Sequence, residues 1–250
     1  MDIEQTKKLL EILQRKKVMK TSELHKELYC SISTLRRALI RLEQVGIVAR
    51  EHGVVKLIKE QNVEFSSNYR SGEHLEEKKY ICELASFFLT DNLAIFLDSS
   101  TTVSHLIPHL RKYQGLIVIT NGLNIASLLA DEENMTVYVI GGELKKHSSS
   151  LFGELSDQFV ANFHTDLAFF SCRGINENGL YEADSRQAMM KRKMIENSKK
   201  AICLCDSSKI NTSHFFKLAD FKQLEALITN EALSEELEEI LEAVGCELSY

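Results

Sequence analysis

The chain lacks any long apolar run, and no stretch approaches the eighteen residues that a membrane-spanning helix needs. Its first residues, Met1 to Gln5, lack the basic segment and apolar core of a secretory signal. Its six cysteines lack the paired CxxC spacing of zinc and dithiol sites. We predict that Cys203 and Cys205 are buried thiols on one strand. We therefore expect a cytoplasmic protein with no membrane segment, no disulfide and no structural metal.

Two phosphate-binding fingerprints are also missing. No GxGxxG follows an apolar run, no P-loop is present, and the pair Gly141-Gly142 alone does not specify a dinucleotide site. We expect no bound cofactor.

Charge is present but unevenly distributed. Residues 1–60 hold 13 Lys and Arg against 8 Asp and Glu, a net of +5, whereas the remaining residues hold 17 against 28, a net of −11. At 250 residues the chain is long enough for two domains. A basic first domain suits DNA binding, because the phosphate backbone supplies much of the sequence-independent affinity.

The basic part has the pattern of a winged helix-turn-helix domain, which we predict over residues 1–58. Apolar spacing predicts three helices and a β-hairpin, over residues 3–15, 22–28, 31–42 and 47–57. Thr21 is the expected N-cap of the second helix, and the hairpin is expected to turn at His52-Gly53.

The third helix has one apolar face and one basic face. Leu35, Leu39 and Leu42 share a side at 3.6 residues per turn, and Ser31 or Ser33 can cap the first turn. By itself this pattern also fits an ordinary solvated amphipathic helix. Its position as the third helix of a winged domain favours DNA binding. The expected DNA-contacting residues are Ser31, Ser33, Thr34, Arg36, Arg37 and Arg41 of the helix, with Arg50 and His52 of the wing.

Residues 59–74 are polar and without clear periodicity, which predicts a linker. Beyond them, short apolar runs predict buried strands over residues 93–97, 116–119, 136–140, 166–171, 201–204 and 225–228. The intervening stretches predict crossover helices over residues 76–90, 103–113, 125–130, 153–163 and 186–199. This alternation predicts a Rossmann-like α/β domain with a parallel sheet over residues 75–250.

Polar residues follow several of these strands, at the sheet edge where open α/β domains bind ligands. Hydroxyls, backbone N–H groups and one lysine suit a phosphate or another oxyanion, although serines also cap helices and glycine pairs also make turns. These strand-end residues are Asp98, Ser99, Ser100, Thr101, Thr102, Thr120, Asn121, Gly141, Gly142 and Lys209.

Further residues fall in the order of a known family pattern. In the first half they are Ser31, Thr34, Arg36, Arg37, Leu39, Leu42, Gly46, Arg50, His52 and Gly53. In the second half they are Asp98, Thr101-Thr102, Thr120-Asn121, Gly141-Gly142, Gly153, Asp166, Gly174, Gly179, Lys191-Arg192-Lys193-Met194 and Asp206-Ser207-Ser208-Lys209. Along nearly its full length the chain resembles the DeoR-type family of bacterial transcriptional regulators of sugar metabolism. It departs from that pattern at Cys30, Leu35, Ala38, Val54 and Ser100, where the family has valine, isoleucine, aspartate, glycine and glycine.

The resemblance implies that the second domain is similar in fold to ribose-5-phosphate isomerase, glucosamine-6-phosphate deaminase and coenzyme A transferases. It also implies a phosphorylated sugar effector, control of operator DNA binding, and a dimer or tetramer. In this interpretation Thr101, Thr102, Thr120, Asn121 and Lys209 hold the phosphate. Asp98, with Glu182 or Asp184, receives sugar hydroxyls.

Two alternatives remain. A sugar-phosphate isomerase or deaminase fused to a DNA-binding domain would need a general base, for which Asp98, Glu182 and Asp184 are available, but no histidine lies in a strand-end motif. A protein-interaction adaptor is the other alternative, and the positive charge of residues 1–60 argues against it.

Overall fold

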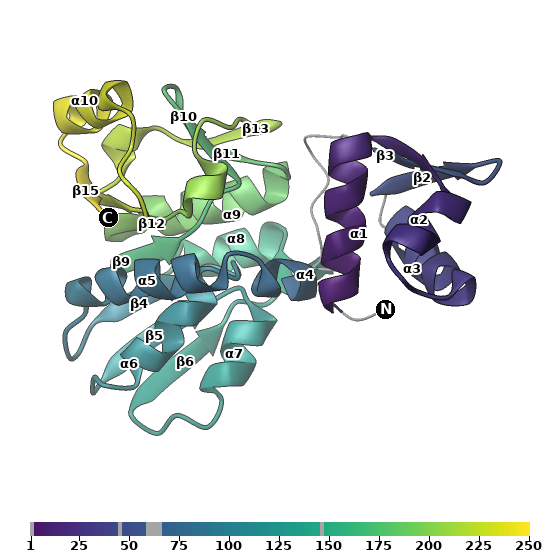
Figure 1. Cartoon of the computed structure of the whole chain (residues 1–250). Coiled ribbons are helices and arrows are strands. Elements are labelled where there is room, and N and C mark those ends of the chain that lie inside the picture. The colour runs from purple at the N-terminus through teal and green to yellow at the C-terminus, as the bar shows by residue number, and fades with distance from the viewer. Residues whose placement is uncertain (1–2, 45–46, 59–66, 146–147) are drawn as a thin grey trace. The chain divides into compact units, whose positions relative to one another are not determined.

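A computed structural model describes residues 3–44, 47–58, 67–145 and 148–250 (Figure 1). The chain divides into two compact units, Met1–Phe65 and Ser66–Tyr250. Within the described ranges, every helix is too short or too polar to cross a lipid bilayer.

The first unit has the predicted winged helix-turn-helix architecture. Its helices are α1 (Ile3–Lys16), α2 (Thr21–Glu27) and α3 (Ile32–Gln44), and its strands are β1 (Val18–Lys20), β2 (Val48–Glu51) and β3 (Val54–Leu57). The strands form an antiparallel sheet in the order β1-β3-β2. Strand β1 was not predicted, because three residues with only Met19 buried give too short an alternation. The core consists of buried leucines from all three helices, among them Leu9, Leu13, Leu24, Leu35 and Leu39.

The wing turn explains two local features of the sequence. His52 and Gly53 have φ values of 48° and 78°, so the positive-φ positions of the two-residue hairpin loop fall on these residues. Val54, where the family pattern has glycine, already belongs to β3, a conformation that suits a β-branched side chain. The prediction that Thr21 caps α2 is wrong. Lys20 occupies the N-cap position, and the Thr21 hydroxyl instead donates to the Gly53 carbonyl at 3.0 Å.

The second unit is built on a parallel sheet, as predicted, but the sheet has seven strands, because Glu247–Ser249 adds one to the six that were predicted. Its strands are β4 (Ala94–Leu97), β5 (Leu116–Thr120), β6 (Met135–Val139), β9 (Thr165–Phe170), β12 (Ser198–Leu204), β14 (Ala226–Ile228) and β15 (Glu247–Ser249). Their order is β15-β14-β12-β9-β4-β5-β6, so the chain winds outward in both directions from the pair β4 and β9. Such a reversal opens a crevice at the carboxyl ends of the two central strands.

Helices cover both faces of this sheet. Ile95 and Leu97 of β4 pack with helices α5 (Leu75–Ala85), α6 (Ile107–Leu110) and α7 (Leu123–Leu129). Phe96, which points to the opposite face, packs with α8 (Glu154–Val160) and α9 (Ser185–Glu196), and α10 (Glu235–Val244) lies over a neighbouring cluster. The short helices η1 (Ser86–Phe88), η2 (Val103–Leu106), η3 (Ser207–Lys209) and η4 (Phe221–Gln223) complete the connections.

Several elements of the second unit differ from the predicted pattern. A hairpin of β7 (Glu143–Lys145) and β8 (Ser150–Phe152), and a small sheet of β10 (Gly174–Asn176), β11 (Gly179–Glu182) and β13 (Phe216–Ala219), lie where no strand was predicted. Helix α4 (Ser67–Gly72) occupies part of the predicted linker, and residues 59–66 lie outside the described residues. A six-residue polar helix leaves no periodic signal, because its stability comes from contacts outside itself.

Candidate functional site

The first candidate surface is the polar face of α3. The Ser31 hydroxyl accepts a hydrogen bond from the Thr34 backbone N–H at 3.1 Å, which confirms Ser31 as a cap, and it contacts the hydroxyls of Ser33 and Thr34 at 2.9 and 2.8 Å. Leu35 and Leu39 are buried beneath this face. The exposed basic residues of the helix are Arg36, Arg37 and Arg41.

Ala38, where the family pattern has aspartate, is buried at the edge of this face. Its methyl group lines a hollow of about 160 Å³ between α1 and α3. The hollow is lined by Thr6, Thr34, Arg37, Ala38, Arg41 and Leu42. The position therefore adjoins two of the predicted DNA-contacting arginines while offering them no carboxylate.

Arg50 has a structural partner within the winged domain. Its guanidinium forms an ion pair with Glu43, with Nε donating at 2.9 Å, and its backbone N–H donates to the same carboxylate at 3.2 Å. Hydrogen bonding from Arg50 lowers the pKa of Glu43. This pair fixes the wing to the end of α3, whereas His52 is exposed at the wing tip. Gly46 of the family pattern lies outside the described residues.

The second candidate site lies where β4 and β9 end side by side. Lys191, from α9, is buried between two carboxylates and forms ion pairs with Asp98 Oδ2 at 3.1 Å and with Glu182. Burial alone would lower the pKa of Lys191, but the charges of Glu182 and Asp98 outweigh it and raise that pKa. Asp98 and Glu182, predicted to receive sugar hydroxyls, thus already hold one ammonium group. We call these three residues the Lys191 triad.

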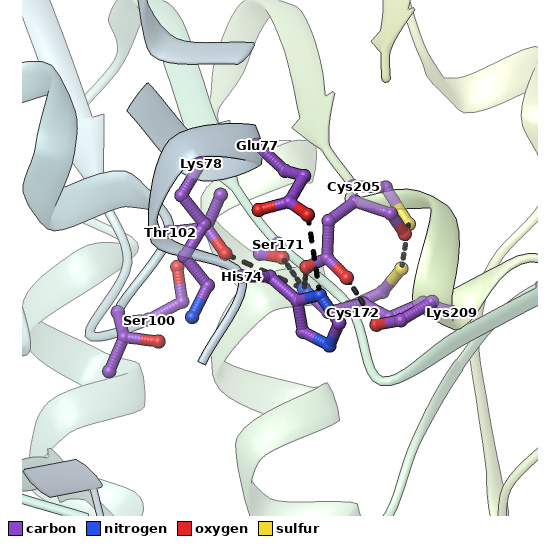
Figure 2. Close-up of polar contacts among 12 residues, drawn as sticks. His74, Glu77, Lys78, Ser100, Thr102, Ser171, Cys172, Cys205 and Lys209 are labelled. Carbon is purple, nitrogen blue, oxygen red and sulfur yellow. Dashed lines mark hydrogen bonds and ion pairs between the residues drawn. The ribbon is translucent and has the colours of Figure 1, made fainter. Parts of the chain in front are cut away.

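Lys209 occupies the next position along the same sheet edge. Its ammonium group lies 2.9 Å from Asp206 Oδ2 and donates to the Ser171 hydroxyl at 3.0 Å and, more weakly, to Thr102 Oγ1 at 3.5 Å (Figure 2). Burial opposes the charged form of Lys209, but Asp206 more than offsets this and raises the Lys209 pKa. For Asp206, burial is outweighed by Lys209 and Ser208, so its pKa is lowered to about 2. We call Thr102, Ser171, Asp206 and Lys209 the Lys209 site.

A second lysine, Lys78 of α5, borders the Lys209 site. Its side chain is 3% exposed and lies beside Ser100 and Thr102 (Figure 2). Burial, followed by the positive charge of Lys209, lowers the pKa of Lys78 to about 8. The two ammonium groups thus repel each other, and an anion bound beside them would relieve that repulsion.

The remaining predicted residues serve the backbone at this edge. Ser100 donates its N–H to Asp98 Oδ1 at 3.0 Å and has no positive φ, so the family's glycine is not needed here. Thr101 is buried and lies 3.5 Å from a carbonyl of α4. Thr120 accepts the N–H of Gly122, whose tight approach to Ser99 leaves no room for a Cβ.

Asn121, Asp184 and the glycine pair have distinct environments. Asn121 is buried and donates to Leu151 O at 3.1 Å, and its Oδ1 has no hydrogen-bond partner among the residues that the structure describes. Asp184 caps α9 and pairs with Lys145 at 3.2 Å, so local structure accounts for its carboxylate. Gly142 has a φ of 145°, and a Cβ there would lie 2.0 Å from a neighbouring serine hydroxyl.

Four residues of this region were not predicted from the sequence to belong to the site: His74, Lys78, Ser171 and Lys191. Lys78 did carry a signal, because it precedes Ile81, Cys82 and Ala85 by 3, 4 and 7 residues and therefore lies on the apolar face of α5. His74 has a φ of 51° at the start of α5, and its charge contributes to the lowered pKa of Asp206. No spacing rule would place that histidine at a strand end.

The cysteines of the site are close but unbonded. Cys172 and Cys205 follow β9 and β12, and their sulfur atoms lie 3.8 Å apart, while all six cysteines are free thiols. In the part of the chain that the structure describes, no three His, Cys, Asp or Glu side chains are grouped to hold a metal ion.

Both units of the chain are similar to domains of known proteins. The DeoR-like helix-turn-helix domain matches residues 6–61, and the DeoR C terminal sensor domain matches residues 73–231. The HTH-type transcriptional repressor GlcR of Bacillus subtilis (strain 168) is 31% identical over 96% of this chain and 93% of its own length. The glycerol-3-phosphate regulon repressor of Escherichia coli (strain K12) is 26% identical, covering 89% of this chain and 88% of that protein. Among solved structures, a D-ribose-5-phosphate isomerase in complex with phospho-erythronic acid matches 54% of this chain and 53% of its own, with 15% identity and a TM-score of 0.41.

Proposed function

Because the chain belongs to the DeoR family of DNA-binding transcriptional regulators of sugar metabolism, we propose that it represses a sugar-catabolism operon under the control of a phosphorylated sugar. The family consists of regulators and not of enzymes, which removes support from the isomerase alternative. A regulator of this kind acts on the chromosome, so the proposal includes a cytoplasmic location.

The DNA-binding half of the proposal assigns α3 to the major groove. Arg36 and Arg37 are exposed on its polar face, and Ser31 organises its first turn so that the serine and threonine hydroxyls lie together. Arginines in this position read guanine edges or hold phosphates, and hydroxyls contact the backbone. His52 at the wing tip is free to reach the adjacent backbone, whereas Arg50 supports the wing through Glu43.

The observation that carries the effector half is a pair of neighbouring lysines, Lys78, which is buried, and Lys209, which is half-buried. A lysine with a pKa lowered to about 8 by burial and a like charge is stabilised when a dianion enters its surroundings. The hydroxyls of Thr102 and Ser171 accept from Lys209, and Ser100 lies beside Lys78 (Figure 2). We infer that the phosphate group of the effector binds there.

The sugar part of the effector extends toward the Lys191 triad and Asn121 in this proposal. Within the described part of the chain the Asn121 Oδ1 atom is a buried acceptor without a partner, and a sugar hydroxyl can supply the donor. Asp98 and Glu182 orient Lys191 and keep acceptor capacity, since each carboxylate has more than one lone pair.

Isothermal titration calorimetry tests the effector half. The full chain is titrated with a panel of sugar phosphates and with the same sugars lacking phosphate. We expect one or a few phosphorylated sugars to bind. Their affinity for Lys209→Ala should be about 10- to 150-fold lower, which corresponds to the loss of a hydrogen bond from a charged donor. Lys199→Ala is the matched control, because Lys199 is an exposed lysine at the opposite end of the same sheet and pairs with Asp166. Equal affinity for sugars with and without phosphate would refute the phosphate assignment.

The direction of regulation and the assembly are tested separately. One winged domain supplies limited specificity, so we propose a dimer or tetramer on repeated half-sites. Sedimentation velocity of the purified chain measures that state directly, and a monomer at all concentrations refutes it. A reporter gene behind the operator, with the regulator deleted, shows repression as increased expression and activation as decreased expression.

A further inference from the structure

Lys78 connects the Lys209 site to helix α4. Its ammonium group donates to the backbone carbonyls of Arg70 and Glu73, each at 2.5 Å. The first carbonyl lies in the last turn of α4 (Ser67–Gly72), and the second lies in the turn that leads to α5. The hydroxyl of Thr101, in the turn after β4, reaches the same Arg70 carbonyl at 3.5 Å.

Helix α4 depends on such outside support. The last carbonyls of any helix have no partner within it, and a cation at that end also stabilises the helix dipole. A six-residue helix lies well below the length at which an isolated helix is stable in water. Lys78 therefore supplies both hydrogen bonds and charge where α4 needs them.

The same ammonium group borders the proposed phosphate site. Lys78 is buried beside Ser100 and Thr102, and it is close enough to Lys209 for the two charges to repel (Figure 2). Hydrogen bonds between two charged groups are roughly twice as strong as those to neutral acceptors. The Lys78 ammonium group has three N–H donors and uses two of them on these carbonyls. A phosphate next to Lys209 that recruits the group toward itself therefore competes with the carbonyls for the position of the ammonium group.

We propose that Lys78 is a positioning residue that couples the phosphate site to α4: an arriving phosphate draws its ammonium group away from the carbonyls of Arg70 and Glu73. Helix α4 then loses its C-terminal support. This helix is the first described element that follows the DNA-binding domain in sequence, so its loosening changes the start of the second unit, next in sequence to that domain. The proposal rests on the phosphate site assigned above.

Hydrogen–deuterium exchange of the full chain, followed by mass spectrometry, tests this coupling. Inorganic phosphate is the probe, and potassium chloride at the same ionic strength is the reference. We expect phosphate to slow exchange in residues 207–212, which contain the Lys209 turn. In residues 67–74 we expect exchange to become at least about fivefold faster, the lower end of typical allosteric coupling.

Two variants separate coupling from simple structural support. In Lys78→Met, residues 67–74 should exchange rapidly without phosphate and show no further change when phosphate is added. Lys79→Met is the matched control, because Lys79 is an exposed neighbour on the same helix that pairs with Glu76 at 2.8 Å, and it should behave like the unmodified chain.

The outcomes distinguish the two levels of the argument. If phosphate leaves residues 207–212 of the unmodified chain unprotected, the phosphate site itself is wrong, and the coupling falls with it. If those residues are protected while residues 67–74 are unchanged or slowed, the site stands and the coupling through Lys78 is refuted. This second comparison needs no variant, so it holds even if Lys78→Met fails to fold.

Discussion

Replacing Lys191 with methionine should destabilise the second unit strongly. The substitution keeps the length of the side chain but removes the ammonium group, leaving Asp98 and Glu182 buried, at 1% and 5% exposure, without their shared partner. The hydrogen bond to the Ser171 carbonyl, 2.7 Å long, is lost as well. Removing one partner of a buried ion pair costs about 3 to 5 kcal/mol.

The expected loss is large enough to measure by differential scanning calorimetry of the full chain. For a domain of about 150–250 residues, each kcal/mol shifts the Tm by about 2–4 °C, so the second unit should unfold about 6–20 °C lower. Lys193→Met is the control on the same helix, since the side chain of Lys193 is 42% exposed and pairs with Glu196 at 3.1 Å. An exposed pair contributes about 1 kcal/mol or less. The reasoning is refuted if the two variants lose the same stability.

The pH dependence supplies a second check with a defined sign. The pKa of Lys191 is raised in the folded chain, so its contribution to stability is fully present below the ordinary lysine value of 10.5. That contribution is lost as the pH rises through the folded pKa. Urea unfolding between pH 8 and pH 11 or above should therefore show the gap between the parent and Lys191→Met narrowing at the alkaline end. A constant gap would mean that the charge of Lys191 is not what stabilises the triad.

Three further predictions concern other parts of the chain. Gel shifts measure binding to an operator that the parent chain selects from random DNA duplexes, and Arg37→Ala should weaken that binding about 5- to 150-fold. Arg15→Ala, at an exposed arginine of α1, should leave the affinity unchanged. Equal losses in the two variants would contradict the assignment of α3. Asp206 has a pKa lowered to about 2 from 3.8, so its contribution of about 2 kcal/mol is present above pH 4 and lost as the pH falls toward 2. Urea unfolding should show the parent losing that stability relative to Asp206→Asn, and parallel pH profiles would argue against it. Gly142→Ala should destabilise by more than about 1 kcal/mol in thermal melts, because φ is 145° and the new methyl would lie 2.0 Å from a hydroxyl oxygen. Gly141→Ala has nothing within 4 Å of its Cβ and should be near neutral, and similar losses in both would contradict the backbone argument.

The elements whose hydrophobic pattern extends over many residues were predictable from the sequence. The amphipathic spacing of α3 predicted its buried leucines, and the apolar runs predicted six of the seven strands of the central sheet. Short elements were not predictable, because β1 and α4 are held by partners outside the elements themselves. Strand β1 pairs with β3, and α4 depends on Lys78 of the next helix. Three to six residues carry too little pattern to indicate either pairing.

The candidate site was predictable by position but not by role. The carboxyl ends of β4, β5 and β12 do bring their polar residues to one edge, as parallel strands require. What the spacing did not show is that Asp98 and Glu182 hold Lys191, and that Asp184 caps α9. A carboxylate has the same sequence signature whether it binds a ligand or a neighbouring lysine, and only the fold supplies the partner.

The placement of three lysines along one sheet edge limits where an anion can bind. Lys191 lies between two carboxylates, so an added phosphate there would face net negative charge. Lys209 has one carboxylate partner, Asp206, and Lys78 has backbone carbonyls instead of an ion pair among its hydrogen bonds. Lys209 thus pairs with one carboxylate where Lys191 pairs with two, so an anion is held better beside Lys209 and its neighbour Lys78 than beside Lys191. The Lys78 ammonium group that would bind such an anion is also the group that donates to the carbonyls at the end of α4. Anion binding and the release of α4 therefore depend on the same ammonium group.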